Sequence, residues 1–176
     1  VLPVGNAGNI SAYWKGFKEL ELVGLANSHP VMIGVQASGA SPVAEAFEAH
    51  AEAIKPTPSP QTVATAIRIG NPVNWKKALA AIRESGGNAE IVTDAEILEA
   101  QRLLARMEGI FTEPAGAAPI AALRRLKERG LLGKDDAVVC VATGHGLKDP
   151  EIALKSCGQP VEAEANVEAL RRVLGV

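Results

Sequence analysis

Short apolar runs alternate with longer amphipathic stretches along this chain. Four runs have the length and composition of buried strands: Leu2 to Val4, Met32 to Val35, Ala89 to Val92 and Val138 to Ala142. Around them, apolar residues recur three or four positions apart, which predicts helices. These helices are expected from Asn9, from Pro42 toward His50, from Asn71 to Gly86, from Thr93 to Gly109, from Glu113 to Gly130 and from Val167 to Leu174. Strands that alternate with helices in this way indicate an α/β fold, a doubly wound, mostly parallel sheet with helices on both faces.

Residues at the expected helix ends agree with this pattern. Asn9 is a favoured N-cap residue, and Pro42 fits the first turn of a helix. Thr93 and Glu96 have the spacing of a capping box. Three prolines in the stretch 55–60 exclude helix there and predict an exposed connection. The residues expected to face the core from three of the helices are Ile10, Tyr13, Trp14, Phe17, Leu20, Ile97, Ala100, Leu104, Met107, Ile120, Leu123 and Leu126.

The composition narrows the class of protein. Lysine plus arginine number 18 and aspartate plus glutamate 20, so the net charge is −2 and bulk charge does not favour nucleic-acid binding. Two cysteines, Cys140 and Cys157, cannot build a disulfide framework, and Cys140 is expected to be an inert core residue in the middle of a strand. No stretch has the length of an apolar membrane span. We therefore expect a cytoplasmic protein whose partners include neither nucleic acid nor a membrane.

The length allows one domain with a sizeable core. We expect a single α/β domain over residues 1–176. The chain opens within the apolar run Val1 to Val4, without the polar lead-in that is common at a terminus. This feature predicts that the chain is part of a longer polypeptide.

The loop Gly5 to Asn9, with the sequence Gly-Asn-Ala-Gly-Asn, is the first candidate for chemistry. It lies between an expected strand and an expected helix, where glycine lets the backbone approach a ligand and the first N–H groups of the helix attract anions. The spacing matches neither the dinucleotide-binding fingerprint nor the P-loop. The loop is therefore interpreted as a phosphate cradle, and a plain strand-to-helix turn stays open as the alternative.

The run Thr143 to Asp149 follows the most strand-like segment and brings together a hydroxyl, an imidazole and an ammonium group. His145 has no metal-ligand spacing, because His29 and His50 are scattered, so no metal site is predicted. The G-x-S-x-G elbow of a serine hydrolase is absent. From its spacing alone this run is as compatible with a structural loop as with a catalytic one.

Glu113 and Arg68 are two further charged candidates. Glu113 precedes Pro114, where an acidic residue suits the start of a helix. Arg68 lies among apolar neighbours, so it is expected to be at least half-buried and to need a carboxylate or phosphate partner.

Five runs of the sequence together resemble the threonine synthase family, in the same order and at similar intervals. They are GNAGNI at 5–10, QASGASP at 36–42, ATAIRIGNP at 64–72, GIFTEPA at 109–115 and TGHGLKDP at 143–150. The resemblance extends from Val4 to about Ile152. The glutamate–proline element is shared by many fold-type-II pyridoxal phosphate enzymes, whereas the first and last runs are more specific.

This resemblance implies an enzyme that binds pyridoxal 5′-phosphate (PLP) and converts O-phospho-L-homoserine and water into L-threonine and phosphate. The residues that it assigns to cofactor binding are Gly5, Asn6, Ala7, Gly8, Asn9 and Thr143. The loop would hold the cofactor phosphate, and Thr143 would face the pyridine nitrogen, to which its hydroxyl is expected to donate a hydrogen bond. Glu113 and Arg68 are kept as possible support for the active site. A homodimer is implied for the full enzyme.

The sequence departs from the family in one respect. The family's Schiff-base lysine lies in the N-terminal half, in a Ser-Phe-Lys-Asp run that this chain lacks. Lys148 belongs to a matched run but is not that lysine in the family. The chain therefore resembles the C-terminal half of a threonine synthase, most of its large domain without the small domain. We assign no catalytic residue within it and expect the isolated chain to be inactive.

Two alternatives stay open. The first is a related fold-type-II enzyme, such as a threonine or serine dehydratase, although dehydratases tend to have a glycine-rich loop where this chain has asparagines. The second is a non-catalytic module that binds phosphate or PLP and acts with another chain. The missing lysine favours this second alternative for the isolated polypeptide.

Overall fold

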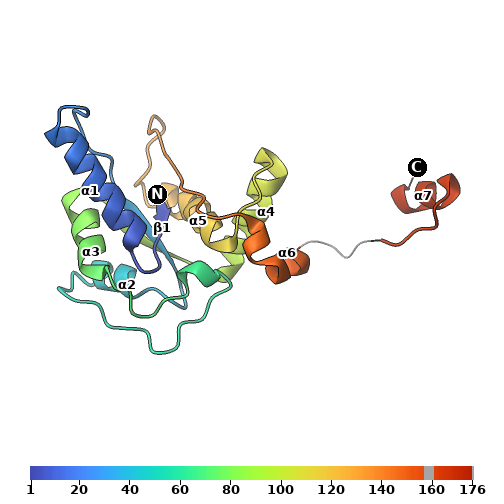
Figure 1. Cartoon of the computed structure of the whole chain (residues 1–176), viewed down its shortest axis with the longest axis horizontal. Helices are drawn as coiled ribbons and strands as arrows, with labels where there is room; N and C mark the ends of the chain where they lie inside the picture. Colours follow the sequence, from blue (N-terminus) through green and yellow to red (C-terminus); the bar gives the residue numbers. More distant parts are fainter. Residues whose placement is uncertain (157–160, 176) are drawn as a thin grey trace.

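A parallel three-stranded sheet forms the centre of the computed structural model, which describes residues 1–156 and 161–175 (Figure 1). The strands are β1 (Leu2–Pro3), β2 (Ile33–Ala37) and β3 (Asn88–Val92), in the order β1-β2-β3. Leu2 lies opposite Gly34, and Ile33 lies opposite Asn88. Because the strands are parallel, the loops that follow them emerge at one edge of the sheet, where ligands of such sheets bind.

Helices cover both faces of the sheet. On one face lie α1 (Gly8–Leu22), α2 (Pro42–Glu48) and α3 (Trp75–Glu84), and on the other lie α4 (Asp94–Glu108) and α5 (Pro114–Glu128). Each face has its own apolar cluster. The first cluster includes Leu2, Val4, Ile10, Trp14, Val43 and Ile82, and the second includes Val35, Val92, Ile97, Ala117 and Leu126. The predicted doubly wound α/β fold is confirmed.

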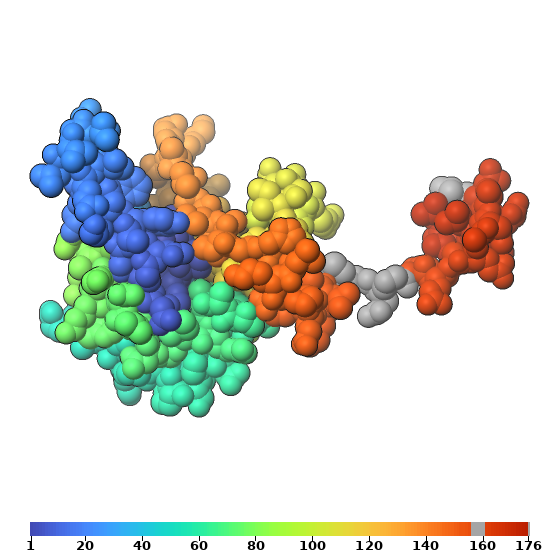
Figure 2. Space-filling model, viewed as in Figure 1, coloured from blue at the N-terminus to red at the C-terminus, as the bar shows by residue number. Residues whose placement is uncertain are grey.

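The remaining elements are short helices in the connections and at the C-terminal end of the chain. Two short 3-10 helices are η1 (Thr65–Ile67) and η2 (Gly146–Lys148), and two α-helices close the chain, α6 (Pro150–Ser156) and α7 (Val167–Leu174). The helix predicted at 167–174 is confirmed, and it stands apart from the body (Figures 1 and 2). Within residues 1–156 and 161–175 no helix is long and apolar enough to cross a membrane. Cys157 lies outside the described residues.

Helix boundaries are confirmed where a local signal defines them. The Thr93 hydroxyl accepts a hydrogen bond from the Glu96 N–H, and the Glu96 carboxylate accepts one from the Thr93 N–H, so the predicted capping box is present. The expected N-cap at Asn9 is wrong, because α1 begins at Gly8 after Ala7. The helix expected from Asn71 begins instead at Trp75, after a turn.

The predicted helix faces are confirmed only where a helix lies over the sheet. Ile10, Trp14, Ile97, Ala100 and Leu126 are buried, as predicted. Some residues expected inside are exposed, namely Tyr13, Leu20 and Met107. The side chains that let α5 lie close to the sheet are small, namely Ala115, Ala117, Ala118 and Ala122.

The strand predicted over Val138 to Ala142 is wrong as a complete strand. The run is extended but joins the sheet only at Val1, whose N–H donates to the Val139 carbonyl at 2.8 Å and whose carbonyl accepts from the Val141 N–H at 3.0 Å. These two bonds have the pattern of a parallel pair between Val1 and Cys140. The ladder stops there because β1 offers only two further residues, and one of them, Pro3, has no N–H.

Candidate functional site

The loop from Gly5 to Asn9 connects β1 to α1 with an unusual backbone conformation. The N-cap residue Ala7 has φ 63° and ψ 20°, in the left-handed region that non-glycine residues seldom adopt. The Ala7 carbonyl accepts bonds from the Ser11 N–H and hydroxyl, at 3.4 and 2.6 Å. A left-handed residue just before a helix turns successive N–H groups toward one point and forms a concavity suited to an anion.

The first turn of α1 has free donors. Within the described residues, the backbone N–H groups of Gly8, Asn9 and Ile10 have no acceptor, and no side chain caps the helix. Gly8 and Asn9 are exposed. A Cβ atom added at Gly8 would meet nothing within 4 Å, so space is open beside the first residue of α1. An anion such as a phosphate group fits this arrangement of donors.

The loop rests on the segment 66–74. A Cβ atom at Gly5 would lie 2.8 Å from the Ala66 carbonyl oxygen, so only glycine permits this approach. The Asn6 carbonyl accepts a bond from the Asn74 N–H at 3.1 Å, and the Asn6 side-chain oxygen accepts one from the Val73 N–H at 3.4 Å. Asn6 therefore anchors the loop through both of its oxygen atoms.

Gln36 is a structural residue of this site that the sequence reasoning missed. It is 1% exposed, and its side-chain nitrogen donates to the Val4 carbonyl at 3.2 Å. Its side-chain oxygen accepts from the N–H groups of Val43 and Ala44, at 2.9 and 3.0 Å. The amide thus ties the end of β1 to the start of α2. The signal was present, because a polar amide in an apolar strand must be hydrogen-bonded.

The loop that begins at Thr143 lies flat against residues 111–116. Thr112 forms an isolated bridge with His145, and the Gly144 carbonyl accepts bonds from the Thr112 hydroxyl and the Glu113 N–H, at 2.7 and 2.8 Å. A Cβ atom at Gly146 would lie 2.4 Å from the ring of Phe111. Glycine is required because the loop packs directly on these residues.

Glu113 and Thr143, two of the predicted site residues, are in contact. Glu113 is 2% exposed, and its side chain does not cap α5. One carboxylate oxygen accepts a bond from the Thr143 hydroxyl at 3.3 Å, and the other lies 3.1 Å from the Lys148 ammonium group. The sequence pointed to an acidic residue at a helix start, whereas the structure places a buried carboxylate under the Thr143 loop.

A second link joins this loop to the segment that supports Gly5. The Thr65 hydroxyl, at the start of η1, donates to the Asp149 carboxylate at 2.9 Å. Sequence reasoning missed this pair, because 84 positions separate its members. The link and the packing of Gly5 connect both candidate loops to the stretch 65–70.

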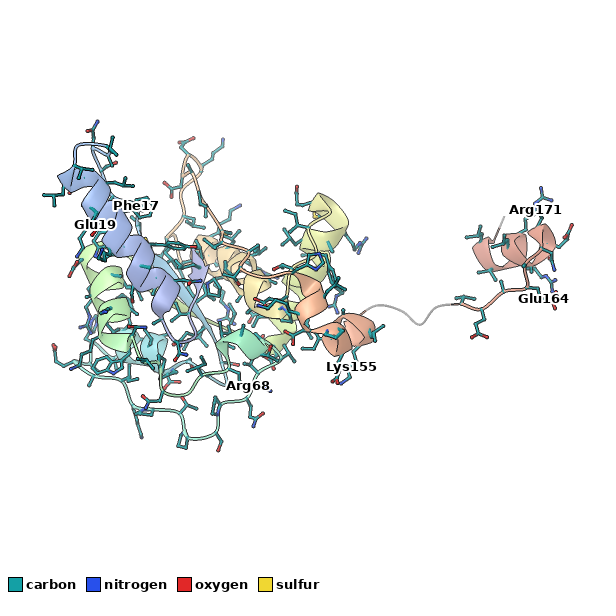
Figure 3. The ribbon with its side chains drawn as sticks, viewed as in Figure 1. Phe17, Glu19, Arg68, Lys155, Glu164 and Arg171 are labelled. Carbon is teal, nitrogen blue, oxygen red and sulfur yellow. The ribbon has the colours of Figure 1, made fainter. Side chains whose placement is uncertain are left out.

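Arg68 lies in that same stretch, but its side chain is not half-buried as expected. Its side chain is exposed, and it makes no ion pair or hydrogen bond within the described part of the chain. Figure 3 shows it beside η1, far from Phe17 and Glu19 of α1. The expectation of a half-buried, paired arginine is wrong, because η1 runs along the surface and turns only Ile67 inward.

The run that leads to Thr143 is linked to the start of the chain, just before β1. The bonds of Val1 to Val139 and Val141 set Val1 beside Cys140. The Val141 side chain packs against the apolar cluster that contains Val4. The run that precedes Thr143 thus lies next to β1 and to the apolar cluster beneath the loop Gly5 to Asn9.

His145 has a structural role in the described residues. Its Nδ1 atom accepts a bond from the Leu147 N–H at 3.2 Å, and its ring meets that of Phe111 edge-on, with the centroids 5.6 Å apart. No group of three or more histidine, cysteine, aspartate or glutamate side chains that could hold a metal ion occurs in the part of the chain that the structure describes.

Burial also affects the pKa of the Cys140 thiol, which lies beside Val1. Cys140 is partly exposed rather than fully buried, and burial raises the pKa of its thiol, an effect that the nearby Val1 ammonium group opposes. A thiol with a raised pKa is a poor nucleophile near neutral pH. The expectation that Cys140 lies in the core of a strand is wrong, because the run 138–142 joins no strand of the sheet and leaves the thiol partly exposed.

Comparisons with known proteins show the family of this chain. The model of the family described as pyridoxal-phosphate dependent enzyme matches residues 1–144. A threonine synthase of Methanocaldococcus jannaschii is 56% identical over 174 residues, which cover 99% of this chain and 43% of that protein. Among solved structures, a threonine deaminase from T.th. is 26% identical with a TM-score of 0.57, and the match covers 73% of this chain and 39% of that one. An L-serine ammonia-lyase of Rhizomucor miehei is 21% identical with a TM-score of 0.69 over 89% of this chain and 49% of its own, which supports the fold alone. The chain spans less than half the length of the relative that it matches at 56% identity, and by the match over residues 1–144 it belongs to the pyridoxal-phosphate dependent enzyme family.

Proposed function

We propose that this chain is the C-terminal portion of a threonine synthase, which converts O-phospho-L-homoserine and water into L-threonine and phosphate. The observation that carries the proposal is the identity of 56% with a threonine synthase over 99% of the chain. The free donors at the start of α1 supply the physical support, because a threonine synthase of this family needs a site for the cofactor phosphate.

Each candidate residue has a defined part in this proposal. The N–H groups of Gly8, Asn9 and Ile10 would bind the phosphate of PLP, with the positive end of the α1 dipole behind them. Gly5 and Asn6 hold the loop in place, and Ala7 supplies its left-handed turn.

Thr143, which follows the run 138–142, would contact the pyridine nitrogen. When bound, PLP supplies an electron-withdrawing ring that stabilises negative charge on an amino-acid substrate. Arg68 would bind an anionic group of the substrate, because its guanidinium is exposed and has no partner among the described residues. Glu113 would hold the Thr143 loop in place through its contacts with Thr143 and Lys148.

We propose that the remaining part of the enzyme binds to an apolar groove on this chain. The groove has a volume of about 490 Å³ and lies between α1, the stretch 30–33 and the stretch 131–139; Figure 2 shows α1 and the loop near residue 135 as separate projections. Tyr13, Val31 and Val139 line it and are exposed. A face of this kind favours a polypeptide partner. The relative of 56% identity has more than half of its length outside the match, and we propose that this portion covers the groove.

Three further properties belong to the proposal. They are a homodimeric enzyme, a cytoplasmic location and the inactivity of the isolated 176-residue chain. The inactivity rests on the missing Ser-Phe-Lys-Asp run, since covalent PLP chemistry needs a positioned amine.

The test compares two polypeptides, the product of the complete reading frame that encodes this chain and the 176-residue chain alone. The first is incubated with O-phospho-L-homoserine, and threonine and phosphate are measured; equal amounts of both are expected. L-threonine and L-serine are offered separately, and release of ammonia from them would indicate a dehydratase instead. Threonine formation by the shorter chain alone would overturn its expected inactivity.

A further inference from the structure

The C-terminal helix α7 has an apolar stripe that the other described residues leave uncovered. Its apolar side chains recur three and four positions apart, at Val167, Leu170 and Leu174, and Val173 lies beside them. All four are exposed, and Leu174 is 69% exposed. The charged side chains of the helix belong to its other side, and they are Glu168, Arg171 and Arg172.

The ends of α7 are defined by its own residues. The Asn166 side chain accepts a bond from the Ala169 N–H at 2.8 Å, and Gly175 follows the helix in a left-handed conformation. A helix of eight residues has little stability in water by itself, because starting a helix costs more than a few backbone bonds return. The apolar stripe of such a helix therefore needs a surface that covers it.

The segment before α7 has the same need. From Val161 to Ala165 apolar and acidic residues alternate, which is the pattern of a strand with one covered face. Val161 is exposed, and the segment pairs with no strand of the described chain. We call residues 161–174 the arm. Both of its parts have the sequence pattern of buried structure and neither is buried here.

Residues 1–156 do not cover the arm. Among the described residues, no hydrogen bond or ion pair joins the stretch 161–175 to the stretch 1–156. Figure 2 shows α7 apart from the body of the molecule, and Figure 3 shows Glu164 and Arg171 well away from Lys155 of α6. The cover of the stripe is therefore to be sought outside residues 1–156.

We infer that the apolar stripe of α7 packs against the part of the longer polypeptide that precedes Val1, so that the arm holds that part to this chain. The inference rests on the proposed function, because it needs this chain to be a C-terminal portion. The threonine synthase of 56% identity matches 99% of this chain, a range that includes the arm, and has more than half of its length outside the match. A surface on the same polypeptide acts at an effective concentration on the order of 1 mM, which favours it over a second copy in dilute solution.

The first test identifies what touches the stripe. The product of the complete reading frame is made with Val173→p-benzoylphenylalanine, irradiated, and digested, and the crosslinked peptides are identified by mass spectrometry. Arg172→p-benzoylphenylalanine, on the charged side of the helix, is the matched control. We expect Val173 to crosslink to residues encoded before Val1 and the control to give much less of this product. Mixing ¹⁵N-labelled and unlabelled protein marks any crosslink between two copies.

The second test uses the wild-type sequence and needs no folded variant. Amide hydrogen exchange in α7 should be at least about tenfold slower in the complete product than in the 176-residue chain alone. Leu170→Gln should remove much of this protection, whereas Arg171→Gln, on the charged side, should keep it.

Each other outcome has a defined meaning. A crosslink from Val173 to residues 1–156 or to a second copy, no crosslink, or equal crosslinks from Val173 and Arg172 would overturn the inference. Equal exchange rates in the two polypeptides would overturn it as well. Threonine synthesis by the same preparation is measured separately, so a preparation that shows the expected crosslink and forms no threonine would overturn the proposed function and leave the arm in place.

Discussion

Gly8 bears one of the three free N–H groups at the start of α1 and has open space at its Cβ position, and this makes Gly8 the most informative position for mutation. A Cβ atom there meets no protein atom within 4 Å, and Gly8 has no left-handed φ. Gly8→Ala should therefore fold, and it should gain up to about 1 kcal/mol in free energy of unfolding, because glycine loses more backbone entropy than alanine.

Gly8→Val should weaken PLP binding strongly, because its methyl groups occupy the space that a phosphate would need. Loss of two charge-assisted hydrogen bonds, at about 1.5 kcal/mol each, amounts to about 3 kcal/mol, or about 100-fold in Kd. The assay is a titration of the complete reading-frame product with PLP, followed by absorbance and by ³¹P NMR, with thermal melting measured by circular dichroism on the same samples.

Gly16 supplies the matched control. It lies in the same helix, and a Cβ atom there also meets nothing within 4 Å, but it is two turns away from the free donors. Gly16→Ala should raise the melting temperature and leave the Kd for PLP unchanged. If Gly8→Val bound PLP as tightly as Gly16→Ala does, the phosphate would not lie at the start of α1, and the reasoning from the free N–H groups would be refuted.

Three other predictions use different parts of the structure. Thr143→Val should weaken PLP binding by about 0.5–1.5 kcal/mol, the range for one hydrogen bond, and an unchanged Kd in the same titration would exclude Thr143 as a ligand contact. Gly144→Ala should lower the free energy of unfolding by about 1–3 kcal/mol in urea titrations, because its Cβ atom would lie 2.3 Å from the buried Glu113 carboxylate, whereas Gly133→Ala, with its nearest contact at 3.4 Å, should not. The Trp14 indole and Lys18 hold the pKa of Glu84 below its ordinary value, so Glu84 stabilises the fold above that value and the stabilisation is lost as the pH falls through the lowered pKa. Glu84→Gln should therefore melt at a lower temperature than wild type at pH 7 and lose less of its melting temperature between about pH 5 and pH 3; an equal loss would contradict this assignment.

The local pattern of the sequence was enough to predict the elements and their class. Thr93 and Glu96 define the start of α4 through contacts within one turn, and Gly109 ends the same helix in a left-handed conformation. The helix at 167–174 was predicted with the same bounds. These features depend on residues a few positions apart, so no knowledge of the rest of the chain is needed.

The position of the first candidate loop was also predictable, whereas its internal geometry was not. A glycine-rich stretch between a strand and a helix indicates a ligand loop. The sequence pointed to Asn9 as the cap, but the chain turns at Ala7 instead. That turn depends on Asn6, which is bonded to residues 73 and 74, and on Gly5, which packs on Ala66.

The sequence by itself determined the positions of β2, β3 and most of the helices and which loops could carry chemistry, because hydrophobic period, caps and glycines act over short distances. Only the tertiary structure decided whether each charged side chain is buried or exposed. It buried Glu113 under Thr143 and exposed Arg68, although local patterns suggested a simple helix start for the first and a half-buried partner for the second. It also left the Val139 side chain exposed, and the run around Val139 is hydrogen-bonded to Val1 but is not a strand of the sheet. Burial and pairing depend on contacts between segments tens of residues apart, and no local pattern contains that information.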